Sequence, residues 1–164
     1  MHLYLIRHGI AAAPEEYKTD EERPLTKEGD RKTRKIAQRL YELDIQFDLI
    51  LTSPLLRTQQ TAQILQTVGL SSQTEKSPAL APSGDIRNWL EWYRQWQETG
   101  LRSLALVGHQ PDLANWAETL LWSQTRDALI LKKAGIIGLL LPETGSPVGC
   151  SQMFWLTAPK FLLR

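Results

Sequence analysis

The first nine residues, MHLYLIRHG (1–9), join a short apolar run to a cation, an imidazole and a glycine. The run at 3–6 is typical of a strand that is buried on both faces of a sheet. Such a strand is expected to continue with apolar residues or to end in a simple turn. Arg7 and His8 fit neither expectation, which raises the question of what they do at the end of a core strand.

The rest of the chain alternates between strand and helix patterns. Further apolar runs with the length of strands occupy 47–52, 104–108, 135–141 and 151–158, the last as an outer strand. Helical spacing of apolar residues extends over 26–43, 53–68, 85–99 and 111–120, with Thr26 and Ser53 as N-caps and Pro54 and Pro111 as first helical residues. This alternation predicts a three-layer α/β/α sandwich with a mainly parallel sheet. We expect one domain over residues 1–164, with the polar loops 10–25 and 70–84 as mobile rims.

The composition is that of an ordinary globular protein. The 164 residues are 42% hydrophobic and 23% charged with a formal net charge of +1, so no global field favours nucleic acid or a membrane surface. Apolar stretches at 3–6 and 134–141 are too short for a signal peptide or a membrane span. The single cysteine, Cys150, excludes an internal disulfide. We expect a cytoplasmic protein with neither nucleic-acid nor membrane partners, and the oligomeric state stays open.

Polar residues follow three of the predicted strands. Arg7, His8 and Gly9 end the first strand, Arg57 comes one helical turn after the second, and His109 ends the third. Ligands of parallel α/β sheets bind beyond the carboxyl ends of the strands. Each residue alone has an ordinary explanation, as a surface arginine or a hydrogen-bonded structural histidine. Their joint placement instead predicts a site.

Two arginines and two histidines suit a phosphoryl group. Guanidinium forks match phosphate oxygens, and a neutral imidazole can attack phosphorus. We expect His8 to be the nucleophile, Arg7 and Arg57 to stabilise the transferring group, and His109 to bind an equatorial oxygen. Gly9 either lets substrate approach the backbone closely or simply ends the strand. The three histidines of the chain lack metal-ligand spacing, so no metal is expected.

At these residues the chain resembles the histidine phosphatase superfamily, which has the phosphoglycerate-mutase-like fold. The resemblance rests on LIRHG (5–9), RPLTKEG (23–29), SPLLRTQQTA (53–62), PALAPSGD (78–85) and VGHQPDL (107–113). Among its members the chain is most similar to the small bacterial phosphohistidine phosphatases of the SixA type. This resemblance implies a phosphorylated His8, a phosphate pocket of Arg7, Arg57 and His109, and no metal or organic cofactor.

The chain also departs from the pattern of the family. Related chains often carry an acidic residue after RHG, where this chain has Ile10, and it has no room for the insertion that supplies a general acid in larger relatives. Asp85 is one candidate for the acid, or else a first-turn residue favoured by the helix dipole. Arg23 either lines the rim of the pocket or forms a salt bridge in the loop.

The missing acid favours one substrate class. Alkoxides of phosphate monoesters are poor leaving groups that need a proton, whereas the imidazole of phosphohistidine can already be protonated. We therefore expect a metal-independent phosphatase acting on a phosphorylated protein, for example a histidine phosphocarrier domain. Two alternatives are a broad phosphomonoesterase or mutase acting on small phosphate esters, and a phospho-ligand binding module with poor turnover.

Four aromatic residues in the third predicted helix share one face: Trp89, Trp92, Tyr93 and Trp96. Such a stripe favours core packing, and a docking face is the alternative.

Overall fold

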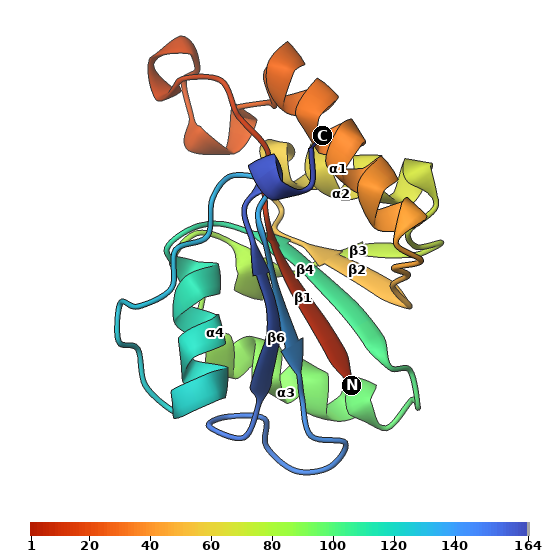
Figure 1. Ribbon diagram of the computed structural model, residues 1–164. Coiled ribbons are helices and arrows are strands. Elements are labelled where there is room, and N and C mark those ends of the chain that lie inside the picture. Colours follow the sequence, from red (N-terminus) through yellow and green to blue (C-terminus); the bar gives the residue numbers. More distant parts are fainter. Residues whose placement is uncertain (164) are drawn as a thin grey trace.

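The computed structural model describes residues 1–163, which form a six-stranded sheet covered by helices (Figure 1). The strands, in the sheet order β3-β2-β4-β1-β5-β6, are β1 His2–Arg7, β2 Leu49–Thr52, β3 Thr74–Lys76, β4 Ser103–Gly108, β5 Ile136–Leu140 and β6 Gln152–Thr157. The helices are α1 Lys27–Glu42, α2 Leu56–Val68, α3 Ile86–Gln97 and α4 Asp112–Trp122, and short 3-10 turns lie at Pro14–Glu16, Asp20–Glu22, Pro78–Leu80 and Pro159–Phe161. The predicted α/β fold is confirmed. None of the helices that residues 1–163 form is long and apolar enough to cross a membrane.

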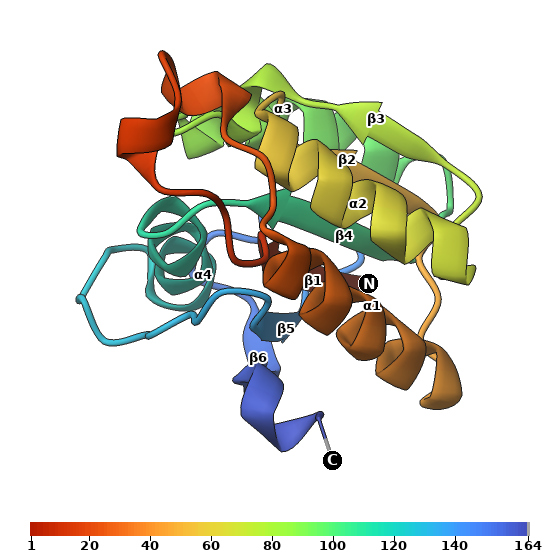
Figure 2. The ribbon, with the colours of Figure 1, turned by 90° about the horizontal axis from the view of Figure 1, so that it is seen from above.

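The central strand β1 is buried on both faces, as predicted. Leu3 and Leu5 belong to the core cluster beneath α3 and α4, whereas Tyr4 and Ile6 belong to the cluster beneath α1 and α2. Successive side chains of a strand point to opposite faces, so the apolar run at 3–6 supplies both layers. α1 and α2 lie side by side on one face of the sheet, and the loop 10–25 lies beside the start of α2 (Figure 2).

The sheet is parallel from β3 to β1 and antiparallel from β1 to β6. β6 is the predicted outer strand. β3 lies within residues 70–84, which were predicted to be a loop. That prediction is wrong for the three residues of the strand, Thr74–Lys76. The strand is short, polar and at the edge of the sheet, so it carries no apolar pattern that would reveal it.

Two of the four predicted helix starts need correction. Thr26 caps α1 as predicted, with its hydroxyl accepting the Gly29 N–H at 2.9 Å. Ser53 does not cap α2, which begins at Leu56, because the backbone stays extended at Leu55. The Ser53 hydroxyl accepts the N–H of Leu55 instead. In α4, Pro111 is the N-cap and Asp112 the first helical residue.

The aromatic stripe of α3 packs mainly into the core. Trp89, Tyr93 and Trp96 are buried, and Trp89 contacts both Tyr93 and Trp116 of α4. Trp92 is half-buried and stacks on Trp96. The core interpretation is therefore confirmed for three of the four residues.

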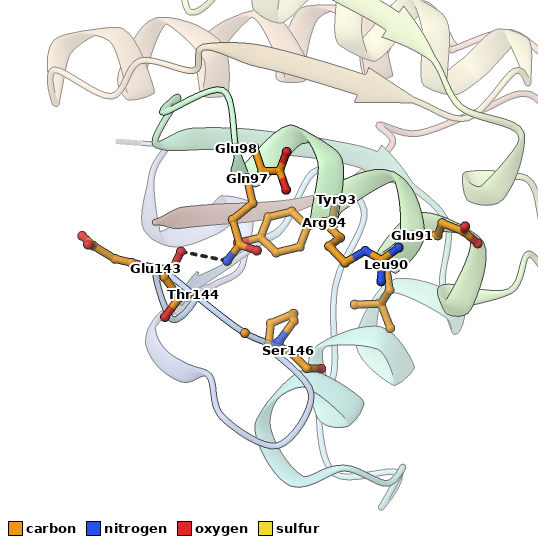
Figure 3. Close-up of a pocket in the computed structure, with 11 residues that line it drawn as sticks. Leu90, Glu91, Tyr93, Arg94, Gln97, Glu98, Glu143, Thr144 and Ser146 are labelled. Carbon is orange, nitrogen blue, oxygen red and sulfur yellow. Dashed lines mark hydrogen bonds between the residues drawn. The ribbon is translucent and has the colours of Figure 1, made fainter.

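A cavity of about 760 Å³ lies between α3 and the loop 143–147 (Figure 3). This loop follows β5, whose Leu140 pairs with His2 at the amino end of β1. The cavity is therefore at the edge of the sheet opposite to His8. It is lined by Tyr93, whose buried hydroxyl has no hydrogen-bond partner within residues 1–163.

Gly29 allows the segment after His8 to approach α1 closely. A Cβ at this position would overlap the Ile10 carbonyl, which already accepts the Thr26 N–H at 2.9 Å. We expect Gly29→Ala to lower the free energy of unfolding by about 2 kcal/mol through this overlap, despite the better helix propensity of alanine. Urea denaturation measures the change, with the exposed Gln38→Ala in the same helix as a control expected within about 0.5 kcal/mol. A stabilised Gly29→Ala variant would contradict this packing.

Candidate active site

The carboxyl ends of three parallel strands bring the predicted site residues together. Arg7 pairs with Gly108 and Thr52 with Val107, so the residues that follow each strand share one edge of the sheet. The N–H of His8 donates to Gly108 O at 3.1 Å, and the N–H of Ser53 donates to Val107 O at 3.0 Å. The predicted convergence of the strand ends is confirmed.

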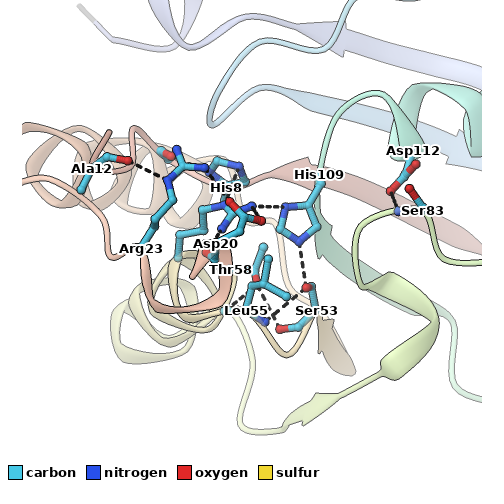
Figure 4. Close-up of polar contacts among 12 residues, drawn as sticks. His8, Ala12, Asp20, Arg23, Ser53, Leu55, Thr58, Ser83, His109 and Asp112 are labelled. Atoms are coloured by element: carbon cyan, nitrogen blue, oxygen red, sulfur yellow. Dashed lines mark hydrogen bonds and ion pairs between the residues drawn. The ribbon is translucent and has the colours of Figure 1, made fainter. Parts of the chain in front are cut away.

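Arg57, in the first turn of α2, links the two histidines. Figure 4 shows His8 and His109 close to Asp20. The Nε of Arg57 donates to His8 Nε2 at 3.3 Å, and its Nη2 lies 3.4 Å from His109 Nδ1. The two imidazole ring centres are 5.4 Å apart. All three side chains are buried, with at most 7% of any residue exposed. A buried guanidinium therefore forms the centre of the cluster.

The hydrogen bonds fix the tautomer of each histidine. His8 Nδ1 lies 2.7 Å from Gly9 O, and a carbonyl can only accept, so Nδ1 carries the proton. The lone pair of His8 is then on Nε2, facing Arg57. In His109 the arrangement is reversed: Nδ1 accepts from Arg57 and Nε2 donates to Ser53 Oγ at 2.8 Å. Ser53, predicted as a helix cap, in fact orients His109.

Burial and nearby cations keep both imidazoles neutral. Burial lowers the pKa of His8 to about 3, and the charges of Arg57, His109 and Arg7 act in the same direction, against the Gly9 carbonyl. Burial likewise lowers the pKa of His109 to about 4, assisted by Arg57 and Arg7 and opposed by the Asp20 carboxylate. A neutral imidazole has the free lone pair that a nucleophile requires.

Arg7 and Gly9 flank His8. Arg7 Nη1 donates to Leu131 O at 3.0 Å, and its buried Nε has no partner among the described residues. The N–H of Gly9 donates to Thr61 Oγ1 at 3.2 Å, and a Cβ on Gly9 would overlap Thr33 Oγ1. Close packing therefore requires a glycine at this position.

Asp20 is a member of the cluster that the sequence did not reveal. Its Oδ2 lies 3.0 Å from Arg57 Nη2, and its carbonyl accepts from Arg57 Nη1 at 2.8 Å. Partial burial raises the pKa of the Asp20 carboxyl, but hydrogen bonds from Arg23 and Arg57 outweigh it and hold this pKa below its usual range. Nothing in the acidic segment around Asp20 distinguishes this residue from its neighbours, so no sequence signal could have identified it.

Arg23 and Asp85 lie outside direct contact with the histidines. Arg23 forms a salt bridge in the loop, which was one of its two predicted roles. Its Nη1 lies 2.7 Å from Asp20 Oδ1, and its Nε donates to Ala12 O. Asp85 caps α3, and its carboxylate binds the N–H and the guanidinium of Arg87. It lines a separate cavity beside residues 75–79. Asp85 thus makes the contacts of the first-turn alternative, and its role as an acid stays a prediction.

Comparison with known proteins places this cluster in a family. Residues 3–81 match the model of the histidine phosphatase superfamily, branch 1. The phosphohistidine phosphatase SixA of Escherichia coli strain K12 is 30% identical over 112 residues, which cover 68% of each chain. The chain belongs to the histidine phosphatase superfamily.

Two further similarities extend over nearly the whole chain. An uncharacterised protein of Picosynechococcus sp. is 46% identical over 164 residues and 99% of both chains. The solved structure of the protein histidine phosphatase SixA complexed with tungstate superposes with a TM-score of 0.87, at 26% identity and 99% coverage of both chains. The similarity thus extends well beyond the RHG motif.

In this histidine phosphatase, a buried carboxylate organises the segment that holds Arg7. Glu118 of α4 is 1% exposed and accepts the N–H groups of Arg126, Asp127, Ala128 and Leu129. Burial raises the pKa of the Glu118 carboxyl, but these four donors outweigh it and lower the pKa below its usual value. The ordered segment leads directly to Leu131, whose carbonyl accepts from Arg7. Glu118 therefore positions a site residue without touching it.

The histidine pKa values predict a pH dependence of stability. Histidines of the unfolded chain have a pKa near 6.5, whereas burial in the fold lowers the pKa of His8 to about 3 and that of His109 to about 4. Between these values the unfolded chain binds more protons, so the free energy of unfolding falls as the pH drops from about 6.5 towards 4.

Urea denaturation at pH 7.5 and 5.0 measures this fall, and the double variant His8→Asn/His109→Gln is expected to show a smaller one. Nitrogen NMR of the imidazoles provides the direct check. We expect neutral rings at pH 5.5, protonated on Nδ1 in His8 and on Nε2 in His109. A charged ring at this pH would contradict the electrostatics described above.

Proposed function

We propose that the chain hydrolyses phosphohistidine in a protein, through a covalent phosphate on His8. The observation that carries the proposal is the His8 Nε2 lone pair, which lies 3.3 Å from the buried Arg57 guanidinium with the neutral His109 ring beside it. A nucleophile next to donors for phosphate oxygens is the arrangement that phosphoryl transfer needs. Membership of the histidine phosphatase superfamily supports phosphatase activity.

In the first half of the reaction, His8 Nε2 attacks phosphorus in line with the leaving group. A new N–P bond forms on His8 while the N–P bond of the substrate phosphohistidine breaks. Arg7, Arg57 and His109 stabilise the negative charge on the equatorial oxygens. The substrate imidazole leaves as a neutral ring because it already carries a proton on its distal nitrogen.

In the second half, water attacks the phosphorus on His8. The N–P bond breaks, inorganic phosphate leaves and the His8 lone pair is restored, so each cycle consumes one water per phosphohistidine. Asp20 is the carboxylate nearest to these events through its contact with Arg57, and it is ionised in the resting site. An ionised carboxylate cannot protonate an alkoxide, which supports a leaving group that needs no acid.

The comparisons support the same substrate class. The Escherichia coli relative is a phosphohistidine phosphatase, and the SixA structure most relevant to the site is a complex with tungstate. Tungstate is a tetrahedral oxyanion with the shape of phosphate.

Trapping of the phosphorylated enzyme tests the proposal. We expect the protein to form acid-labile phosphate when it meets a phosphorylated histidine phosphocarrier, and His8→Ala to abolish the labelling because the acceptor nitrogen is gone. Arg57→Ala should reduce turnover by about 10² or more, since it removes a donor to the transition-state charge. Rapid-quench labelling and phosphate release measure both effects.

Other outcomes of this experiment would replace the proposal. Labelling that survives in His8→Ala but is lost in His109→Ala would assign the other histidine as nucleophile. Faster hydrolysis of small phosphate esters than of the phosphocarrier would favour a phosphomonoesterase. Saturable binding without turnover of either substrate would favour a binding module.

Asp20 and a substrate phosphate compete for the same Nη2 of Arg57. We therefore expect Asp20→Asn to strengthen inhibition by inorganic phosphate about three- to ten-fold, because it removes an internal anion from the guanidinium. The inhibition constant against p-nitrophenyl phosphate hydrolysis measures the effect. Glu22→Gln, which removes the same charge from the same 3-10 turn, is the matched control and should leave this constant within twofold. An unchanged constant in Asp20→Asn would show that the carboxylate does not compete.

A further inference from the structure

A second cavity, of about 460 Å³, adjoins the site on the side of Arg7. It shares Arg7, Gly9 and Ile10 with the segment around His8. Its remaining wall comes from the first turns of α1, the segment 132–134 and the C-terminal residues 159–163. An occupant of this cavity would therefore lie next to a phosphoryl group on His8.

The cavity is strongly basic. Arg7 and the four lysines Lys32, Lys132, Lys133 and Lys160 line it, and no Asp or Glu of the described residues does. Lys32 forms an exposed pair with Glu28, but no carboxylate within residues 1–163 pairs with the other three lysines. The formal net charge of the whole chain is only +1, so this concentration of cations is local.

Two buried polar groups in this cavity lack partners within the described chain. Thr33 is 1% exposed, and its Oγ1 has no hydrogen-bond partner. The buried Nε of Arg7 has none either. A buried donor without an acceptor costs free energy, and an oxyanion in the cavity would supply the acceptor.

From these observations we propose that the cavity binds acidic side chains that flank the phosphohistidine of a protein substrate. The inference rests on the proposed function and adds a specificity site to it. Exposed lysines carry point charges on flexible stems, so they attract several carboxylates at varied positions rather than one rigidly placed phosphate. Apolar lining by Ile10, Ala134 and Leu163 fits the methylene groups of such side chains.

A pair of phosphohistidine peptides tests the inference, one with glutamates on both flanks and one with glutamines at the same positions. We expect the wild-type protein to favour the acidic peptide by about tenfold in kcat/KM at low salt, and to lose this preference as salt screens the lysines. The double variant K132E/K133E should abolish or reverse the preference. K132R/K133R, which retains the charge, should preserve it.

The double variant R94E/R102E is the matched control, because it makes the same charge change at exposed positions outside the lysine cavity. It should keep the preference for the acidic peptide. Hydrolysis of p-nitrophenyl phosphate, which has no flanking groups, should stay within twofold in K132R/K133R and R94E/R102E. A wild-type protein that does not discriminate, or a K132E/K133E variant that still does, would overturn the inference.

Failure of the proposed function would be visible separately, as absence of peptide turnover by the wild type. Affinities of His8→Ala for the same two phosphopeptides would then decide the inference on binding alone. Equal affinities would overturn it, whereas a preference lost in K132E/K133E would support it. A different outcome would be a higher KM for phosphoserine in K132E/K133E, with no discrimination between the two peptides. It would assign the cavity to small phosphorylated acids and overturn the proposal that it binds acidic side chains of a protein.

Discussion

The candidate site depends on one buried guanidinium. Arg57 donates to His8, contacts His109 and is held by the carboxylate and carbonyl of Asp20, so one side chain joins three strand ends and a loop. Burying this cation is costly unless it is paired and hydrogen-bonded. Asp20 provides that pairing in the free protein, and a dianionic phosphoryl group would provide it in a complex. Arg57 therefore needs an anionic partner in both states, which is the Asp20 carboxylate in the free protein and a phosphoryl group in the complex.

The electrostatics of the imidazoles follow from this arrangement. Because Arg57 and Arg7 lie near both rings, protonation would place further positive charge in a buried site, and burial itself already disfavours it. Neutrality is thus a property of the site as a whole and not of either histidine. The tautomers depend on smaller groups, the Gly9 carbonyl and the Ser53 hydroxyl, which leave the lone pair of each ring facing Arg57.

The sequence was informative wherever a residue is tied to a strand end. His8 and His109 directly follow parallel neighbours, so recognising β1 and β4 was enough to place them together. Asp20 could not be placed, because the path of its loop is set by 3-10 turns and by the Arg23 contacts, which leave no periodic pattern. The antiparallel direction of β5 could not be predicted either, because an apolar run does not indicate the direction of its strand. That direction depends on the segment 126–129, which precedes β5 and is held by Glu118.

Ile10 connects the backbone packing with the charge of the neighbouring cavity. Its carbonyl fixes the segment against Thr26 and Gly29, and the residue also lines the cavity together with the lysines. An acidic residue at this position would act as a built-in counterion and neutralise part of the cavity from within. With an uncharged residue there, neutralisation of the lysines is left to whatever molecule arrives from outside.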